Sequence, residues 1–273
     1  MEGILYLVAT PIGNLDDITL RAIKILNEVD IIACEDTRHT LKLLNHLEIK
    51  KPLISYHRHN EEYKTGELIE MLQGGKSIAL VTDAGTPAIS DPGEEIVKSA
   101  IENNIKIVPI PGACALINAL IVSGLNTKHF AFYGFLPLNK KNREKVFENI
   151  KKENATIILY EAPHKLNNTL KDISKNIGNI NIVLAKEITK IHENFIRGKI
   201  DDIISNIETI KGEYIIILDL NNEENENEIP EIGLDELYEK YEKEGLEKKE
   251  IIKNIAKLKG VSKNEIYQYF LDK

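Results

Sequence analysis

Short apolar runs alternate with amphipathic segments along the first half of the chain. Residues 4–9 (ILYLVA) predict a buried strand, and a turn rich in polar residues separates them from a helix that begins near Ile18. The same order of apolar run, turn and helix recurs from residues 30, 52, 79 and 105. Repeated units of this kind predict a mainly parallel sheet, with the turns at Thr10, Asp83 and Pro111 opening on one edge.

The pattern changes after residues 123–127. Apolar runs at residues 155–162, 180–188 and 213–220 predict further strands, with helices between them. The gap between residues 188 and 193 is too short for a crossover helix, so the run ENFIRG that follows is expected to form a hairpin partner. We therefore expect a second α/β domain with some antiparallel pairing.

The C-terminal part is polar first and helical afterwards. Residues 221–229 (NNEENENEI) are acidic and of low complexity, which predicts a linker. Three amphipathic segments follow; the second carries Ile251, Ile252, Ile255 and Leu258 on one face, and Ser262 caps the third. The predicted organisation is an N-terminal α/β domain (1–124), a second α/β domain (125–220), an acidic linker (221–231) and a helix-turn-helix-like module (232–273).

The stretch LVTDAGTPAISDPG (residues 80–93) is the most informative loop. It opens as a buried strand and then collects Asp83, Gly85, Pro87, Pro92 and Gly93 before the next helix. Glycine permits close approach to a ligand, proline fixes the shape of the loop, and ligands of open α/β sheets bind outside the carboxyl ends of the strands. A rigid surface turn has the same composition, so this stretch alone leaves both interpretations open.

Composition narrows the class of protein. With 273 residues and 42 % hydrophobic content, the chain can form about two packed domains. Its two cysteines, Cys34 and Cys114, lie in apolar runs, which argues for a reducing compartment and against a disulfide framework or cysteine-based zinc site. His57 and His59 have no third ligand at metal spacing, so no metal is expected. No apolar run approaches membrane-spanning length, and we expect a soluble, cytoplasmic protein.

Charge is unevenly distributed. The net charge of −8 argues against non-specific coating of nucleic acid. However, residues 136–152 carry six basic against two acidic side chains, and residues 247–273 carry seven against four. A solvated helix face explains either segment taken singly.

Seven blocks of sequence carry a family resemblance. They are VATPIGNLDDIT, ACEDTRHT, VTDAGTPAISDPG, PIPGACALINAL, FYGFLP, YEAPHKL and KEITKIHENFIRG. Together and in this order they resemble the ribosomal RNA small-subunit methyltransferase I family of the tetrapyrrole methylase superfamily, from the first strand to about Leu220. The helical tail also resembles the C-terminal extension of that family. Thr10, Pro11 and Ile12 interrupt the glycine-rich first turn that is usual in tetrapyrrole-modifying relatives, which favours the RNA branch.

The resemblance implies a function and a set of site residues. It implies two α/β domains with S-adenosylmethionine folded in the cleft between them, and 2′-O-methylation of a cytidine ribose in the decoding region of 16S ribosomal RNA. The implied partners are the small ribosomal subunit and a second copy of the chain, in a homodimer without membrane attachment. By motif position, the implied cofactor-binding residues are Pro11, Asp83, Ala84, Gly85, Ile89, Ser90, Ala113, Leu159, Tyr160 and Leu218.

Methylation of a hydroxyl also requires loss of its proton, so a general base is expected. Asp36 with Arg38, and Lys186 with Glu187, lie at predicted strand ends and are the candidate catalytic residues. Helix capping by Asp36 and an interdomain salt-bridge network are the structural alternatives. Two other functions stay open: a methyltransferase of the same superfamily with a tetrapyrrole or protein acceptor, and a ribosome assembly factor without activity.

Overall fold

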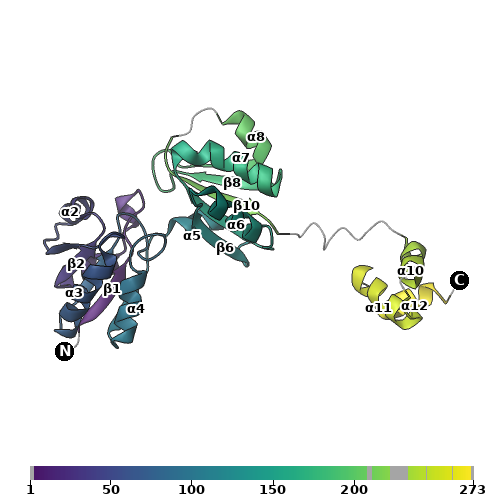
Figure 1. Cartoon of the computed structure of the whole chain (residues 1–273), viewed down its shortest axis with the longest axis horizontal. Coiled ribbons are helices and arrows are strands. Elements are labelled where there is room, and N and C mark those ends of the chain that lie inside the picture. Colours follow the sequence, from purple (N-terminus) through teal and green to yellow (C-terminus); the bar gives the residue numbers. More distant parts are fainter. Residues whose placement is uncertain (1–2, 208–210, 222–232, 244, 260, 272–273) are drawn as a thin grey trace. The chain divides into compact units, whose positions relative to one another are not determined.

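The computed structural model describes residues 3–207, 211–221, 233–243, 245–259 and 261–271. The chain divides into two compact units, residues 1–220 and residues 221–273. Figure 1 shows that the first unit contains two sheet-based lobes, whereas the second is a helical bundle. The mixed α/β class predicted from the sequence is confirmed. Most of the predicted linker (221–231), the last residues of the helix predicted to reach Ile210 and the side chain of Leu258 lie outside the described residues.

The first sheet is entirely parallel. It contains β1 (Ile4–Val8), β2 (Ile31–Cys34), β3 (Leu53–Ser55), β4 (Ile78–Val81) and β5 (Lys106–Ile110), in the order β3-β2-β4-β1-β5. The helices that connect them are α1 (Leu20–Glu28), α2 (Thr37–His46), α3 (Glu61–Gln73) and α4 (Glu94–Glu102). The predicted parallel sheet is confirmed, and its order makes β4, β1 and β5 neighbours, so the turns after these three strands lie side by side.

Both faces of this sheet are buried. Along β4, Ile78 and Leu80 pack in one apolar cluster and Ala79 and Val81 in the other, as expected for a parallel sheet with helices on both faces. The first helix starts at Leu20 instead of near Ile18, because a 3-10 turn (η1, Leu15–Asp17) precedes it and the Thr19 side chain accepts a hydrogen bond from the backbone N–H of Ala22.

The second sheet is mixed. It contains β6 (Phe130–Phe135), β7 (Thr156–Glu161), β8 (Asn181–Lys186), β9 (Asn194–Lys199) and β10 (Tyr214–Asp219), in the order β6-β7-β10-β8-β9. Only β6 and β7 pair in parallel, and the predicted β8–β9 hairpin is confirmed. The helices of this lobe are α6 (Lys140–Ile150), η2 (Pro163–Lys165), α7 (Leu166–Ile177) and α8 (Ile200–Asn206).

The two faces of the second sheet have different partners. Leu159, Leu218 and their neighbours pack with α6, α7 and α8. The opposite face packs against α5 (Ala115–Ile121), whose Leu116 and Leu120 contact the face that carries Ile158. The helix α5 precedes the predicted boundary at residue 124, yet it packs on the second sheet and so connects the two lobes of the first unit.

The second unit, taken by itself, is a three-helix bundle. Helices α10 (Leu234–Lys243), α11 (Lys248–Lys259) and α12 (Lys263–Tyr269) surround an apolar cluster that includes Leu237, Ile255 and Ile266. The predicted cap is present: the Ser262 hydroxyl accepts from the backbone N–H of Glu265, and the Glu265 carboxylate accepts from that of Ser262. Among the described residues, none of the helices combines the length and apolar character needed to cross a membrane.

Candidate functional site

The turns at the carboxyl ends of β1, β4 and β5 are tied together by hydrogen bonds. The backbone N–H of Thr10 donates to the Gly85 carbonyl (2.9 Å), and the N–H of Gly85 donates to the Thr10 carbonyl (3.1 Å). The Thr86 hydroxyl donates to the carbonyl of Ala113 in the third turn (3.0 Å). The sequence prediction that these three turns share one edge is therefore confirmed in detail.

Residues 85–93 form a strained loop. Ala88 and Ser90 both have φ near 65°, and Gly85 (87°) and Gly93 (142°) also lie in the left-handed region. Non-glycine residues adopt this region at a cost, and they do so mainly where the surroundings fix them. Here the Arg58 guanidinium donates to the Ser90 carbonyl, and the Gly93 N–H donates to the Glu61 carboxylate (2.9 Å). These two contacts hold the strained loop against the β3–α3 segment.

A cavity of about 450 Å³ lies beside this loop, within the first unit. Its walls come from the 85–93 loop, the ends of β7, β8 and β10, and the start of α5. The lining residues are Ile12, Ala84, Gly85, Thr86, Ile89, Ser90, Asp91, Cys114, Ala115, Phe135, Tyr160, Glu161, Ala162, Pro163, Ala185, Ile188, Glu213, Tyr214 and Ile215. The size and the mainly apolar walls suit a small organic ligand.

Half of the predicted cofactor-binding residues line this cavity, namely Ala84, Gly85, Ile89, Ser90 and Tyr160. The Tyr160 hydroxyl accepts from the backbone N–H of Leu116 (3.2 Å), which fixes the ring between the second sheet and α5. Phe132 and Phe135 make edge contacts with the same ring, with centroids 4.9 and 5.6 Å away. Tyr160 is therefore a rigid part of the cavity wall.

The other five are not among the lining residues. Leu159 and Leu218 are fully buried on the opposite face of the second sheet, so their side chains do not reach the cavity. Pro11 and Ala113 lie next in sequence to the lining residues Ile12 and Cys114. Asp83 lies beside Ala84, and its carboxylate accepts from the backbone N–H of Asp36 (3.1 Å).

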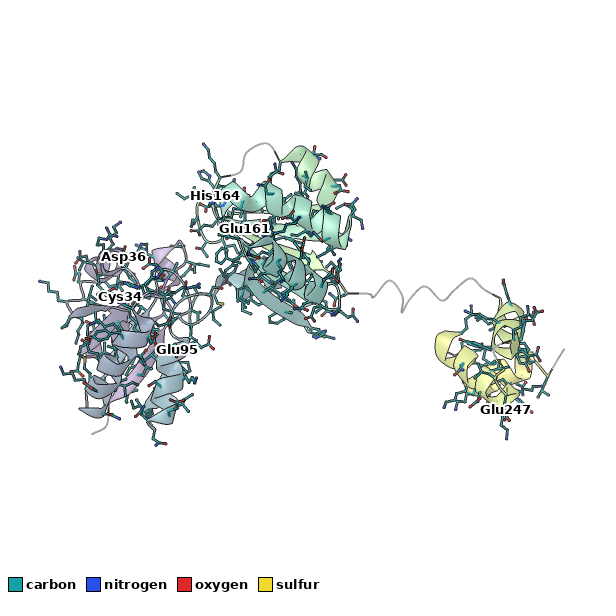
Figure 2. All side chains as sticks on the ribbon, viewed as in Figure 1. Cys34, Asp36, Glu95, Glu161, His164 and Glu247 are labelled. Carbon is teal, nitrogen blue, oxygen red and sulfur yellow. The ribbon has the colours of Figure 1, made fainter. Side chains whose placement is uncertain are left out.

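Asp36 and Arg38 form a local pair at the start of α2. Figure 2 labels Asp36 just beyond Cys34, at the end of β2. The Asp36 carboxylate accepts from the backbone N–H of Arg38 (2.8 Å) and from its guanidinium (2.7 and 3.1 Å), so Asp36 is the N-cap of α2. The guanidinium and backbone hydrogen bonds from Arg38 lower the pKa of Asp36. Neither residue lines the cavity, so this geometry fits the capping alternative.

Lys186 is the last residue of β8 and Glu187 follows it, between the cavity-lining residues Ala185 and Ile188. Glu187, at φ 51°, accepts from the backbone N–H of Glu213 (2.8 Å) and from the Lys190 ammonium (3.0 Å), which also contacts the Glu213 carboxylate (3.0 Å). The backbone hydrogen bond from Glu213 is the main cause of its lowered pKa. These contacts place Glu187 in a salt-bridge network that supports the cavity-lining residues Ile188 and Glu213, and Lys186 lies beside it.

Three acidic residues of the cavity wall, Asp91, Glu161 and Glu213, are absent from the predicted set. Asp91 belongs to the quoted block VTDAGTPAISDPG, and Glu161 belongs to YEAPHKL. Glu161, labelled in Figure 2, is 5 % exposed and is the last residue of β7, the strand that also carries Tyr160. Asp91 and Glu161 lie in blocks rich in turn residues, and these blocks were the sequence signal that could have identified both as site residues. Within the described ranges, no group of three or more His, Cys, Asp or Glu side chains could hold a metal ion.

Comparison with known proteins identifies similar chains along the whole length. The family model described as "Tetrapyrrole (Corrin/Porphyrin) Methylases" matches residues 4–204. The chain is 48 % identical to ribosomal RNA small subunit methyltransferase I of Halalkalibacterium halodurans, over 98 % of this chain and 95 % of that protein. It is 46 % identical to the protein of the same name from Bacillus subtilis, over 98 % and 94 %.

Solved structures show the same fold at low sequence identity. A diphthine synthase aligns with a TM-score of 0.63 at 15 % identity, over 79 % of this chain and 90 % of that one. A uroporphyrin-III-C-methyltransferase from Thermus thermophilus aligns with a TM-score of 0.56 at 20 % identity, over 80 % and 95 %.

Proposed function

Because this chain belongs to the tetrapyrrole methylase family, and within it to the ribosomal RNA small subunit methyltransferase I family, we propose that it methylates the 2′-oxygen of a cytidine ribose in the decoding region of 16S ribosomal RNA. Identity above 45 % along nearly the whole chain is the observation that carries the proposal. The chain is an S-adenosylmethionine-dependent methyltransferase, as its family is. The choice of nucleotide and ribose atom is the proposed part.

The cavity fits this methyl donor. S-adenosylmethionine supplies a methyl group on a positively charged sulfur and also carries an adenine ring and an amino acid end. Apolar groups such as Ile12, Tyr160 and Ile215 can enclose the less polar portions, and the backbone around Gly85 offers hydrogen-bonding groups. A side chain at position 85 would meet Ile12 and the Ala113 carbonyl, so this glycine lets the first and third turns pack closely against the loop. Asp91 and Glu161 provide negative charge suited to a sulfonium.

The proposal is tested by transfer of tritium from methyl-labelled S-adenosylmethionine. Purified small ribosomal subunits lacking the modification, free 16S RNA and ribosomal proteins are offered separately. Label in RNA, located to a cytidine that resists alkaline cleavage because its 2′-oxygen is blocked, is the expected result. Label in protein or on a tetrapyrrole would favour the alternative acceptors, and a folded protein that binds the donor without transfer would favour an assembly factor.

The protein is also proposed to act in the cytoplasm as a homodimer. Ile117, Ile121 and Val122 leave 41–63 % of their surface exposed around the end of α5, which gives a second copy an apolar surface to cover. Sedimentation at several protein concentrations tests this state. A monomer at micromolar concentration would contradict it.

The three-helix unit is proposed to contact ribosomal RNA phosphates. Lys253 and Lys263 are exposed on α11 and α12. Their joint replacement by Gln should raise the KM for small subunits several-fold and flatten the slope of log KM against log salt by about 1.5, because each phosphate contact contributes about 0.7–0.9 to that slope.

The matched control replaces Lys98 and Lys106 by Gln, since both are exposed and lie on α4 and at the start of β5. It removes the same charge from the lobe of the first sheet and should leave the salt slope unchanged. Equal slopes for both double variants would show a general charge effect and would contradict contact by the helical unit.

A further inference from the structure

Asp91 occupies a distinctive position in the cavity wall. It follows the strained residue Ser90, lines the cavity, and lies close to the carboxylates of Glu35 and Asp83, which follow β2 and β4. The Thr82 hydroxyl lies among these groups and donates to Glu35 (3.1 Å). The positive charge of Arg58 acts on Asp91, and the Arg58 guanidinium donates a hydrogen bond to the Ser90 carbonyl. The carboxylate of Asp91 thus belongs to the cavity wall and lies near two other carboxylates and one guanidinium.

The protonation behaviour of Asp91 differs from that of the other candidate carboxylates. Burial, opposed by the nearby Thr82 hydroxyl and assisted by repulsion from Glu35, raises the pKa of Asp91 to about 6. Hydrogen bonds lower the pKa values of Asp36 and Glu187. A general base works best when its pKa lies close to the working pH. Of these three carboxylates, Asp91 is therefore the best suited to receive a proton near neutrality.

We propose that Asp91 is the general base of the methyl transfer, which accepts the proton of the acceptor hydroxyl inside the cavity. In this step the hydroxyl oxygen forms a bond to the methyl carbon as the carbon–sulfur bond breaks. The sulfur keeps the electron pair of that bond and becomes a neutral thioether, and the hydroxyl proton moves to a carboxylate oxygen of Asp91. No further reactant is needed.

The strained loop serves this role by fixing the base. Positive φ values at Ala88 and Ser90 turn the chain sharply just before Asp91, and the contacts of Arg58 and Glu61 with the loop keep it in that conformation. Tyr160 lines the same cavity from the second lobe; burial is the main cause of the raised pKa of this phenol, and the charge of Asp91 adds to it. The groups that influence Asp91 are therefore Glu35, Thr82, Asp83 and Arg58 from the first lobe and Tyr160 from the second.

The test compares Asp91→Asn with Asp91→Glu, using full-length protein and small ribosomal subunits. The assignment of Asp91 as the base rests on the proposed function, so methyl transfer by the wild-type protein to the subunits is measured first. Absence of that transfer would refute the proposed function, whereas a failure confined to the Asp91 variants would refute the assignment. Asp91→Asn should lower kcat by about 10²- to 10⁴-fold, with donor affinity by calorimetry within a few-fold of wild type. Asp91→Glu should recover part of the rate because it restores a carboxylate.

The pH profile separates a base from a structural residue. Wild-type kcat under conditions where methyl transfer limits the rate should rise with pH through an apparent pKa of about 6 and then level, and the residual rate of Asp91→Asn should lose this step. Asp36→Asn and Glu187→Gln, measured in parallel, should keep the step. The assignment would be overturned if Asp91→Asn kept the kcat of the wild-type protein, or if it lost only donor affinity. It would also be overturned if the pH step disappeared in Asp36→Asn or in Glu187→Gln.

Thermal unfolding provides a readout that does not involve activity. Because the pKa of Asp91 in the folded state is raised above the ordinary value of an aspartate, the folded state binds the proton more tightly, and ionisation of Asp91 destabilises the fold as pH rises from about 4 to 6. Asp91→Asn removes this penalty, so its melting temperature relative to wild type should increase by a few degrees between pH 4 and pH 7. A decrease over the same range would show that the ionised carboxylate is a stabilising contact and would overturn the proposed role.

Discussion

Gly85→Val should weaken S-adenosylmethionine binding at least tenfold, or about 1.4 kcal/mol, while the protein remains folded. Gly85 has φ 87°, and a Cβ atom there would lie 3.1 Å from Ile12 Cγ2 and 3.6 Å from the Ala113 carbonyl oxygen. The larger valine side chain must displace the first turn or extend into the cavity. Calorimetric titration of the donor measures the loss, and circular dichroism verifies the fold.

Gly124→Val is the matched control for backbone strain. Gly124 has φ 80°, but an added Cβ meets nothing within 4 Å. Both variants should lose about 1–2 kcal/mol of stability from the left-handed backbone conformation, whereas only Gly85→Val should lose donor affinity. Equal donor affinities in the two folded variants would show that the donor does not bind at this loop.

Glu161→Ala should cost about 3 kcal/mol or more of folding stability. The buried carboxylate accepts from the Thr169 hydroxyl (2.5 Å) and from the backbone N–H of Ala162 (2.8 Å). Arg143 in turn donates to the Thr169 hydroxyl (2.9 Å) and to the Asp172 carboxylate (2.8 Å). Truncation leaves buried donors without acceptors, which is more damaging than loss of an exposed ion pair. The melting temperature should fall by about 6–12 °C.

Glu148→Ala supplies the comparison on the surface. Its carboxylate pairs with Lys151 at 2.9 Å, but 62 % of the side chain is exposed, so the loss should stay below about 0.5 kcal/mol. Glu161→Gln keeps one acceptor oxygen and should lie between the two in stability. A melting temperature for Glu161→Ala within 2 °C or so of that for Glu148→Ala would mean that the buried network contributes little.

The sequence was most informative where local chemistry and topology agree. Repeated strand, turn and helix segments dictate a parallel sheet, and the parallel order brings the turns at Thr10, Asp83 and Pro111 together. The N-cap at Ser262 was equally predictable, because short polar side chains before an apolar helical stripe bind the first backbone N–H groups. These features depend on neighbours in the chain.

The inward and outward faces of buried strands were harder to predict. The run ATIILYEA is apolar at nearly every position, so its periodicity does not show which residues face α5 and which face α6 and α7. Leu159 and Tyr160 are adjacent, yet only Tyr160 lines the cavity. The packing of α5 on the second sheet and the place of Asp91 in the cavity wall likewise depend on long-range contacts that one sequence does not encode in any local pattern.

The strand order of the first sheet also constrains when it can form during synthesis. The strand β1 has only β4 and β5 as neighbours, and β4 also separates β1 from β2. The N-terminal strand therefore has no partner in the sheet until Ile78–Val81 has been made, about 70 residues later. At translation rates of about 5–20 residues per second this delay is roughly 4–14 s. During synthesis the apolar strand β1 is therefore unpaired for several seconds. Strands β1 and β2 can join one sheet only after the third crossover, through α3, has delivered β4 between them.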